Sequence, residues 1–294
     1  MARRRLNPAD LRARVGDIEF RNPIMLASGT AGYGAELAGY LDLAGLGAVV
    51  TKSLAAFEWA GNPAPRVHPT TAGMLNAVGL QGGGVEHWLQ HDLPALLATG
   101  ATVVASIWGR SLDEYAAAAA MMAAAPAGVV AVEVNLSCPN LQGHGMFAQS
   151  ATAAASVIEA CLGAGHPLWA KLTAAVTDLP SIAGAVAAAG AAAVTLINTL
   201  PGMAIDVRTG KPILGNGSGG LSGPAIHPIA VKAVWDVHAA HPDLPIVGVG
   251  GVATADDAIE LMLAGASAVQ IGTATFANPG VAGEIVASLS RRQL

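Results

Sequence analysis

A short apolar segment, a loop and an alanine-rich segment recur in this order along the chain, and this repeat limits the possible folds most strongly. Eight apolar segments have the length and boundaries of β-strands; they are residues 24–28, 48–53, 102–108, 129–137, 168–173, 193–198, 246–250 and 268–272. Seven segments between them are predicted to be helices; they are residues 35–44, 84–99, 112–125, 151–164, 178–189, 228–240 and 255–264. Eight alternating strands and helices predict a (β/α)8 TIM barrel, with residues 1–294 forming a single domain.

The remaining segments fit this barrel. Residues 11–20 alternate about a Gly-Asp turn and predict an N-terminal hairpin that could plug the bottom of the barrel. Residues 54–83 and 199–227 are too long to be simple turns, and both follow strand ends. We therefore expect them to form lids or substrate walls on the C-terminal face of the strands. A doubly wound open sheet is disfavoured, because no Gly-x-Gly-x-x-Gly turn follows the first strand.

Composition excludes several classes of protein. A net charge of −5 offers no basic surface for nucleic acid. No apolar run reaches the roughly 18 residues that span a bilayer, and no signal peptide opens the chain. Two cysteines, Cys138 and Cys161, are too few for a disulfide framework, a zinc cluster or an iron–sulfur site. A reduced cytoplasmic protein without a metal site is the simplest expectation.

Cys138 stands where the fourth predicted strand gives way to a loop, because Pro139 cannot continue a sheet ladder. Asn135 and Asn140 bracket this thiol with amide groups that both donate and accept hydrogen bonds. Taken alone, a free cysteine is more often a small buried hydrophobe than a reactive group. In a parallel barrel, however, catalytic groups come from the carboxyl ends of several strands.

The other strand ends are also polar or glycine, although the strands are apolar. These residues are Ser28, Lys52, Ser53, Ser106, Asn135, Lys171, Asn198, Thr199, Gly250, Gly251, Gly272 and Thr273. The glycines after the last two strands could let backbone N–H groups approach a phosphate, although either pair could also be only a tight turn.

Lysine and asparagine side chains suggest the kind of ligand. Lys52 and Lys171 end strands that carry almost no other charge, and a cation beside an electron-accepting ring would stabilise the charge that reduction creates. The amides of Asn76, Asn135, Asn140 and Asn198 match the donor and acceptor edge of a pyrimidine. For any single asparagine, turn formation is the alternative.

Residues 135–140, Asn-Leu-Ser-Cys-Pro-Asn, resemble the active-site signature of class 1 dihydroorotate dehydrogenases, the FMN enzymes of pyrimidine (UMP) biosynthesis. The similarity extends over nearly the whole chain, through residues 22–29, 61–66, 73–81, 170–172, 197–199 and 219–226. Residues 203–206 and 211–213 are similar to the class 1B branch.

This resemblance implies a role for each matching residue. Cys138 would be the base that removes the C5 proton of dihydroorotate while a hydride leaves C6 for flavin N5, which gives orotate. The implied FMN contacts are Ser28, Lys52, Ser53, Ser106, Asn135, Lys171, Ile197, Gly223, Gly250, Gly251, Gly272 and Thr273, with the last four at the phosphate. The implied substrate contacts are Lys52, Asn76, Ala77, Val78, Gly79, Leu80, Asn135, Asn140, Asn198 and Thr199. Lys171 would lie at the N1–C2 carbonyl edge of the flavin.

The resemblance also implies partners. Class 1B enzymes pass electrons to a separate subunit that carries FAD and an iron–sulfur cluster, and then to NAD; class 1 chains generally form homodimers. Some positions depart from the pattern: Ser106 stands where the family usually has asparagine, Gly82-Gly83 stands where it has Asn-Pro, and Pro201 follows Leu200 in the substrate loop. The loop over residues 141–150 matches the family only loosely.

Four other functions stay open. A class 1A-like enzyme would use fumarate and need no partner. A dihydropyrimidine dehydrogenase-like barrel would act on uracil, although Lys52 favours a substrate with a carboxylate. A non-redox phosphate-binding barrel, with Cys138 merely buried, and a non-catalytic binding subunit are the remaining readings.

Overall fold

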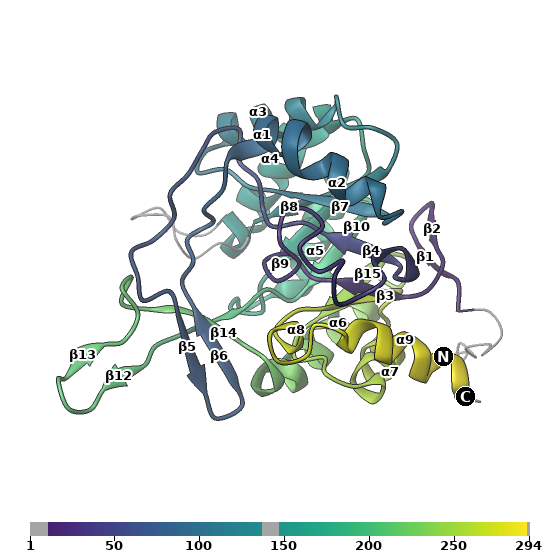
Figure 1. The fold of residues 1–294 in the computed structure, drawn as a ribbon. Helices are drawn as coiled ribbons and strands as arrows, with labels where there is room; N and C mark the ends of the chain where they lie inside the picture. The colour runs from purple at the N-terminus through teal and green to yellow at the C-terminus, as the bar shows by residue number, and fades with distance from the viewer. Residues whose placement is uncertain (1–10, 137–146, 293–294) are drawn as a thin grey trace.

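Eight parallel strands close into a barrel in the order β10-β15-β16-β3-β4-β7-β8-β9 (Figure 1). The computed structural model describes residues 11–136 and 147–292. The barrel strands are β3 (Ile24–Leu26), β4 (Ala48–Val50), β7 (Val103–Ile107), β8 (Val129–Asn135), β9 (Leu168–Leu172), β10 (Ala193–Leu196), β15 (Ile246–Val249) and β16 (Ala268–Ile271). The (β/α)8 prediction is confirmed, and each strand ends before its predicted last residue.

Helices cover the outside of the barrel in six of the seven predicted places. They are α1 (Gly84–His87), continued by the π-helical segment η2 (Trp88–Asp92) and α2 (Leu93–Ala98), then α3 (Leu112–Met122), α4 (Ala151–Cys161), α5 (Leu179–Ala188), α6 (His227–Ala240) and α7 (Ala255–Ala264). Side-chain oxygens of Ser111, Ser150, Asp178 and Thr254 accept a backbone hydrogen bond where four of these helices begin. Two further helices, α8 (Ala274–Ala277) and α9 (Val281–Arg291), were not predicted.

The predicted helix over residues 35–44 is wrong. This segment consists of turns that end in the short 3-10 helix η1 (Leu43–Gly45). Its first turns close over three residues, from the Ala38 N–H to the Ala35 carbonyl and from the Tyr40 N–H to the Leu37 carbonyl. Gly39 lies between them, and glycine is a poor helix former. The apolar spacing is helical, but the backbone does not continue as a helix.

The predicted hairpin is confirmed as β1 (Ala13–Val15) paired with β2 (Ile18–Phe20). Val15 and Phe20 pack with inward-facing residues from the N-terminal ends of the barrel strands. The rings of Phe20 and Trp169 lie edge to face, with centroids 6.0 Å apart. The bottom of the barrel is therefore filled by apolar side chains.

The two long connections build a second, antiparallel sheet in the order β11-β14-β6-β5. Its strands are β5 (Val67–Thr70), β6 (Gly73–Asn76), β11 (Leu200–Gly202) and β14 (Gly219–Ser222). The hairpin of β12 (Ile205–Asp206) and β13 (Lys211–Pro212) projects from it as an arm at the lower left of Figure 1. Because these connections leave β4 and β10 at their carboxyl ends, the sheet forms a wall beside the mouth of the barrel.

The plug gives a stability prediction. Phe20→Ala removes a ring that is only 2% exposed, and we expect the free energy of unfolding to fall by about 3–5 kcal/mol. Val207→Ala is the control, because Val207 is 95% exposed and its truncation should change stability by less than about 0.5 kcal/mol. Urea unfolding followed by circular dichroism measures both. Equal midpoints for the two variants would show that the hairpin does not help to close the barrel.

Candidate active site

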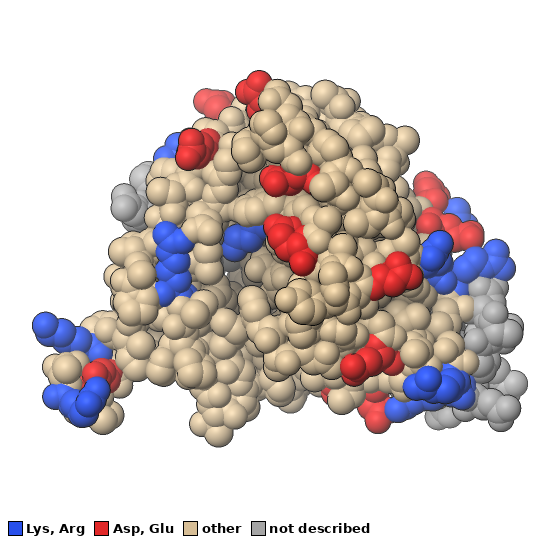
Figure 2. Space-filling model, viewed as in Figure 1, with Lys and Arg blue, Asp and Glu red and all other residues tan. Residues whose placement is uncertain are grey.

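A cavity lies at the carboxyl ends of the barrel strands, between the barrel mouth and the wall formed by β6 and β14. Its empty space, including the open mouth, is about 1170 Å³, which is enough for a mononucleotide and a small ring beside it. The face drawn in Figure 2 is hollowed near its centre, and basic side chains lie beside this hollow.

The cavity collects most of the residues that the sequence predicted for the site. Those on its wall are Ser28, Lys52, Ser53, Asn76, Val78, Gly79, Leu80, Asn135, Lys171, Ile197, Asn198, Thr199, Gly223, Gly250, Gly251, Gly272 and Thr273. Ser106 and Ala77 are not on the wall. Cys138 and Asn140 lie outside the described residues, so their predicted roles stay predictions.

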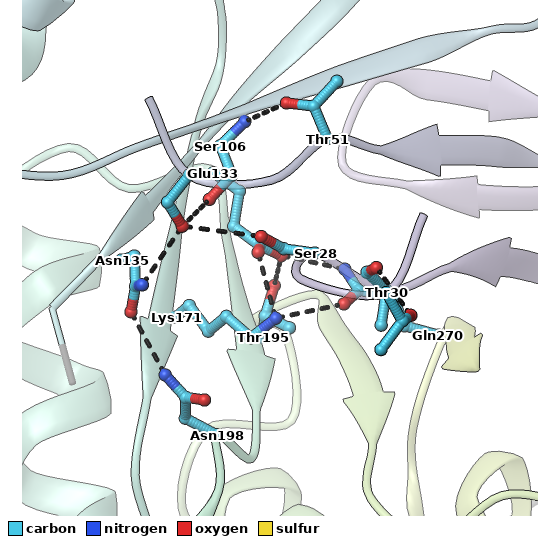
Figure 3. A network of polar contacts seen from close by, with 12 residues as sticks. Ser28, Thr30, Thr51, Ser106, Glu133, Asn135, Lys171, Thr195, Asn198 and Gln270 are labelled. Atoms are coloured by element: carbon cyan, nitrogen blue, oxygen red, sulfur yellow. Dashed lines mark hydrogen bonds and ion pairs between the residues drawn. The ribbon is translucent and has the colours of Figure 1, made fainter. Parts of the chain in front are cut away.

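A chain of hydrogen bonds fixes the amide side chains on one wall. Asn198 Nδ2 donates to Asn135 Oδ1 over 3.1 Å, and Asn135 Nδ2 donates to Ser53 Oγ over 3.2 Å (Figure 3). Asn198 Oδ1 in turn accepts from the Thr199 backbone N–H at 2.8 Å. Each amide is thus held in one orientation, and the atoms that remain on it can read a planar heterocycle.

Ser106 lies behind this wall. Its side chain is fully buried, and its Oγ is 2.9 Å from Ser53 Oγ. Its backbone N–H donates to Thr51 Oγ1 at 3.1 Å. The short hydroxyl therefore supports Ser53 and does not reach the cavity itself, so the predicted direct contact of Ser106 with a ligand is not supported.

The loop after β6 also supplies backbone groups to the cavity wall. Gly79 and Leu80 have φ angles of +78° and +59°, and a leucine in this region is uncommon. Such positive-φ conformations occur often at ligand sites. The Ala77 N–H is already used, since it donates to the Arg66 carbonyl over 2.7 Å. Among the backbone amides of residues 77–80, those of Val78, Gly79 and Leu80 therefore remain the candidates for a ligand.

Lys171 reaches the cavity from a buried polar layer that the sequence did not reveal. The layer consists of Glu133, Thr195 and Gln270, all fully buried inside the barrel. Lys171 Nζ lies 3.1 Å from Glu133 Oε1, and Lys171 itself is 5% exposed. A glutamate in an apolar strand hints at such a partner, but nothing in its own segment tells which residue it pairs with.

Glycine turns after β14 and β15 approach one another at the far end of the cavity. Gly223 and Gly251 have φ angles of +95° and +69°, which favour glycine. A Cβ on Gly251 would lie 2.8 Å from the Gly223 carbonyl oxygen, and a Cβ on Gly223 would lie 2.6 Å from the Gly73 Cα, so neither turn tolerates a side chain. Nearby, Thr273 Oγ1 donates to Ser222 Oγ over 2.8 Å. Because these turns carry no side chains, their backbone N–H groups can approach a phosphate closely.

His227 was also missed by sequence reasoning. Its Nδ1 donates to the Gly250 carbonyl over 2.8 Å, and its Nε2 lies 3.2 Å from Glu260 Oε2. The side chain thereby connects the start of α6 to the turn after β15.

At the neighbouring start of α7, burial raises the pKa of Asp257, but hydrogen bonds from Ala253 and Thr254 outweigh this effect and lower the pKa.

Several known proteins are similar to this chain over nearly its whole length. The chain is 48% identical over 279 residues to "Dihydroorotate dehydrogenase B (NAD(+)), catalytic subunit" of Desulforudis audaxviator, covering 94% of this chain and 90% of that one. The proteins of the same name from Geobacter sulfurreducens and Trichlorobacter lovleyi are 47% and 46% identical over 96% and 97% of this chain, and over 92% and 94% of their own. The dihydroorotate dehydrogenase family model matches residues 10–292, and this chain belongs to that family.

Proposed function

We propose that this protein oxidises dihydroorotate to orotate with FMN in the cavity at the barrel mouth, as a step of pyrimidine biosynthesis. The observation that carries this proposal is the meeting of three features in one cavity. Two lysines, an ordered chain of amides and a pair of close glycine turns all face the same space. A carboxylated pyrimidine and a flavin phosphate together need these three kinds of group.

The residues present fit FMN. The glycine turns at Gly223 and Gly251 come as close as a phosphate cradle requires, because a side chain on either would collide with backbone. Lys171 would lie along the flavin ring, and Asn135 and Ser53 would face it from the amide chain. FMN supplies the acceptor for the hydride that leaves the substrate.

The substrate would lie on the side of the cavity bounded by the loop after β6. Lys52 and the N–H groups of Val78 to Leu80 would bind its carboxylate. Asn76, Asn198 and Thr199 would hold the ring edges, with Asn198 oriented by its bond to Asn135. Uracil has no carboxylate for Lys52, so the site favours dihydroorotate over a dihydropyrimidine.

Cys138 would act as the general base at the carboxyl end of β8 and remove the C5 proton, with Asn140 beside it at the substrate. The support for this role is the sequence signature at residues 135–140. A thiol must be partly ionised to accept a proton, and its ordinary pKa of about 8.5 leaves a usable fraction of thiolate near neutral pH.

The names of the relatives suggest which partner this chain has. Each is called a catalytic subunit of an NAD(+) enzyme, which implies a separate electron-transfer subunit. We infer a subunit with FAD and an iron–sulfur cluster for this chain as well, a homodimer as the catalytic core, and a cytoplasmic location. Within residues 11–136 and 147–292, no three His, Cys, Asp or Glu side chains gather as metal ligands. In the same residues no helix has the length and apolarity to cross a bilayer.

Anaerobic reduction tests this function. The purified protein supplemented with FMN should lose its yellow colour on addition of dihydroorotate and keep it with dihydrouracil. Subsequent addition of NAD⁺ with the proposed partner subunit should restore the colour; restoration by fumarate alone would point to the class 1A-like alternative. A protein that stays colourless after FMN is supplied would favour a non-redox barrel or a non-catalytic subunit.

Replacement of the proposed base gives a second prediction. Cys138→Ala should retain FMN and lose turnover by roughly 10²–10⁴-fold, the contribution of a general base. Cys138→Ser should be as weak near neutral pH and recover in part in alkali. Steady-state rates and flavin absorbance measure both properties, and full activity in Cys138→Ala would exclude the thiol as the base.

The two cysteines should differ in reactivity. Burial raises the pKa of Cys161 to about 12, so at pH 8 only about one molecule in 10⁴ carries its thiolate. Iodoacetamide should therefore modify one thiol in the native protein and none in Cys138→Ala. Mass spectrometry of the labelled peptides shows which cysteine is modified. Labelling of Cys161 as fast as Cys138 would contradict the burial of Cys161.

A further inference from the structure

Behind Lys171 lies a carboxylate that cannot touch any ligand in the cavity. Glu133 is fully buried in the barrel and is not on the cavity wall. Its two oxygens are the meeting point of three donors in Figure 3. Lys171 Nζ lies 3.1 Å from Oε1, while Thr195 Oγ1 and Gln270 Nε2 donate to Oε2 over 3.0 and 2.8 Å.

The same layer holds the ammonium of Lys171 from a second side. Gln270 donates to Glu133 and presents its Oε1 to Lys171 Nζ at 3.4 Å, so one amide bridges both charges. Glu133, Lys171, Thr195 and Gln270 come from four different strands, β8, β9, β10 and β16. Because strands of a closed barrel cannot shift singly, the ammonium is held in one place at the inner end of the cavity.

Burial makes this arrangement necessary. An ammonium that is 5% exposed loses most of its hydration, and this loss costs free energy unless an anion lies beside the cation. Among the described residues on the cavity wall, Lys52 is the only other charged one, and it is also a cation. The negative charge that balances Lys171 in this layer comes from Glu133.

We propose that Glu133 is a positioning residue that holds the ammonium of Lys171 aimed into the cavity, and thereby sets how strongly the site stabilises negative charge on a reduced flavin. This inference rests on the proposed FMN site. Glu133 acts only through Lys171, since it does not reach the cavity. The carboxylate therefore affects the midpoint potential of the bound flavin and has no contact with the substrate.

The test is the midpoint potential of bound FMN in Glu133→Gln, measured anaerobically against reference dyes. Glutamine keeps the size and one acceptor oxygen but removes the negative charge, so the ammonium of Lys171 loses the ion pair that aims it into the cavity. We expect the preference of the site for reduced over oxidised FMN to fall at least tenfold, which corresponds to a potential lower by about 30 mV. An unchanged or a raised potential would overturn the inference.

Two further variants separate this effect from general damage. Thr195→Val removes one donor to Glu133 and keeps both charges. The preference of this variant for reduced over oxidised FMN should stay within about two- to threefold of the wild-type preference, because only one ordinary hydrogen bond is lost. Lys171→Met should lower the potential as Glu133→Gln does. Adding Glu133→Gln to Lys171→Met should lower it no further, because the two residues act as one unit.

This set stays decisive if Glu133→Gln alone does not fold. The double variant removes both charges, so it leaves no unpaired charge inside the barrel. The midpoint potential of its bound FMN can be compared with that of Lys171→Met. If the preference for reduced over oxidised FMN differed more than tenfold between the double variant and Lys171→Met, Glu133 would act on the flavin independently of Lys171, which would overturn the inference. A wild-type protein that takes up no FMN would overturn the cofactor proposal and this inference together. Wild-type protein that binds FMN, with an unchanged Glu133→Gln, would overturn the inference alone.

Discussion

Closure of eight parallel strands into a barrel forces every second side chain of each strand into one narrow interior, and the rest of the molecule follows from how that space is filled. At the N-terminal ends, apolar residues such as Met25 and Trp169 fill it and the β1–β2 hairpin covers it. At the next level the filling is polar, with Glu133, Lys171 and Gln270 joined by hydrogen bonds. Above them the strands end, and only there does the interior open to a ligand.

The polar level is a poor way to stabilise a barrel. A buried ion pair loses about as much free energy by desolvation as it regains by attraction, and apolar residues of similar size often replace such pairs without loss. The alternating inward positions below, which hold alanine and valine, show that this chain can fill its interior with apolar groups. The Glu133–Lys171 pair is better explained by its place, because its cation faces the cavity and its anion does not.

Local sequence patterns predicted the barrel because each strand is a short apolar run whose polar terminal residue marks the barrel mouth. They failed where structure depends on distant partners or on backbone conformation. The strand β14 contains two glycines and β11 contains Pro201, so neither shows the alternation of a strand; their pairing with each other and with β6 makes the wall. Glu133 and Gln270 are 137 positions apart, so no local pattern could join them. Residues 35–44 have helical spacing, but glycine and short turns interrupt them.

A crystal structure of the protein with FMN and orotate would show whether the cavity at the barrel mouth holds both ligands. We expect the flavin ring against Lys171 and Asn135, its phosphate at Gly223, Gly251 and Thr273, and the orotate carboxylate at Lys52 and the amides of Val78 to Leu80. FMN bound elsewhere, or orotate bound away from both lysines, would contradict this expectation.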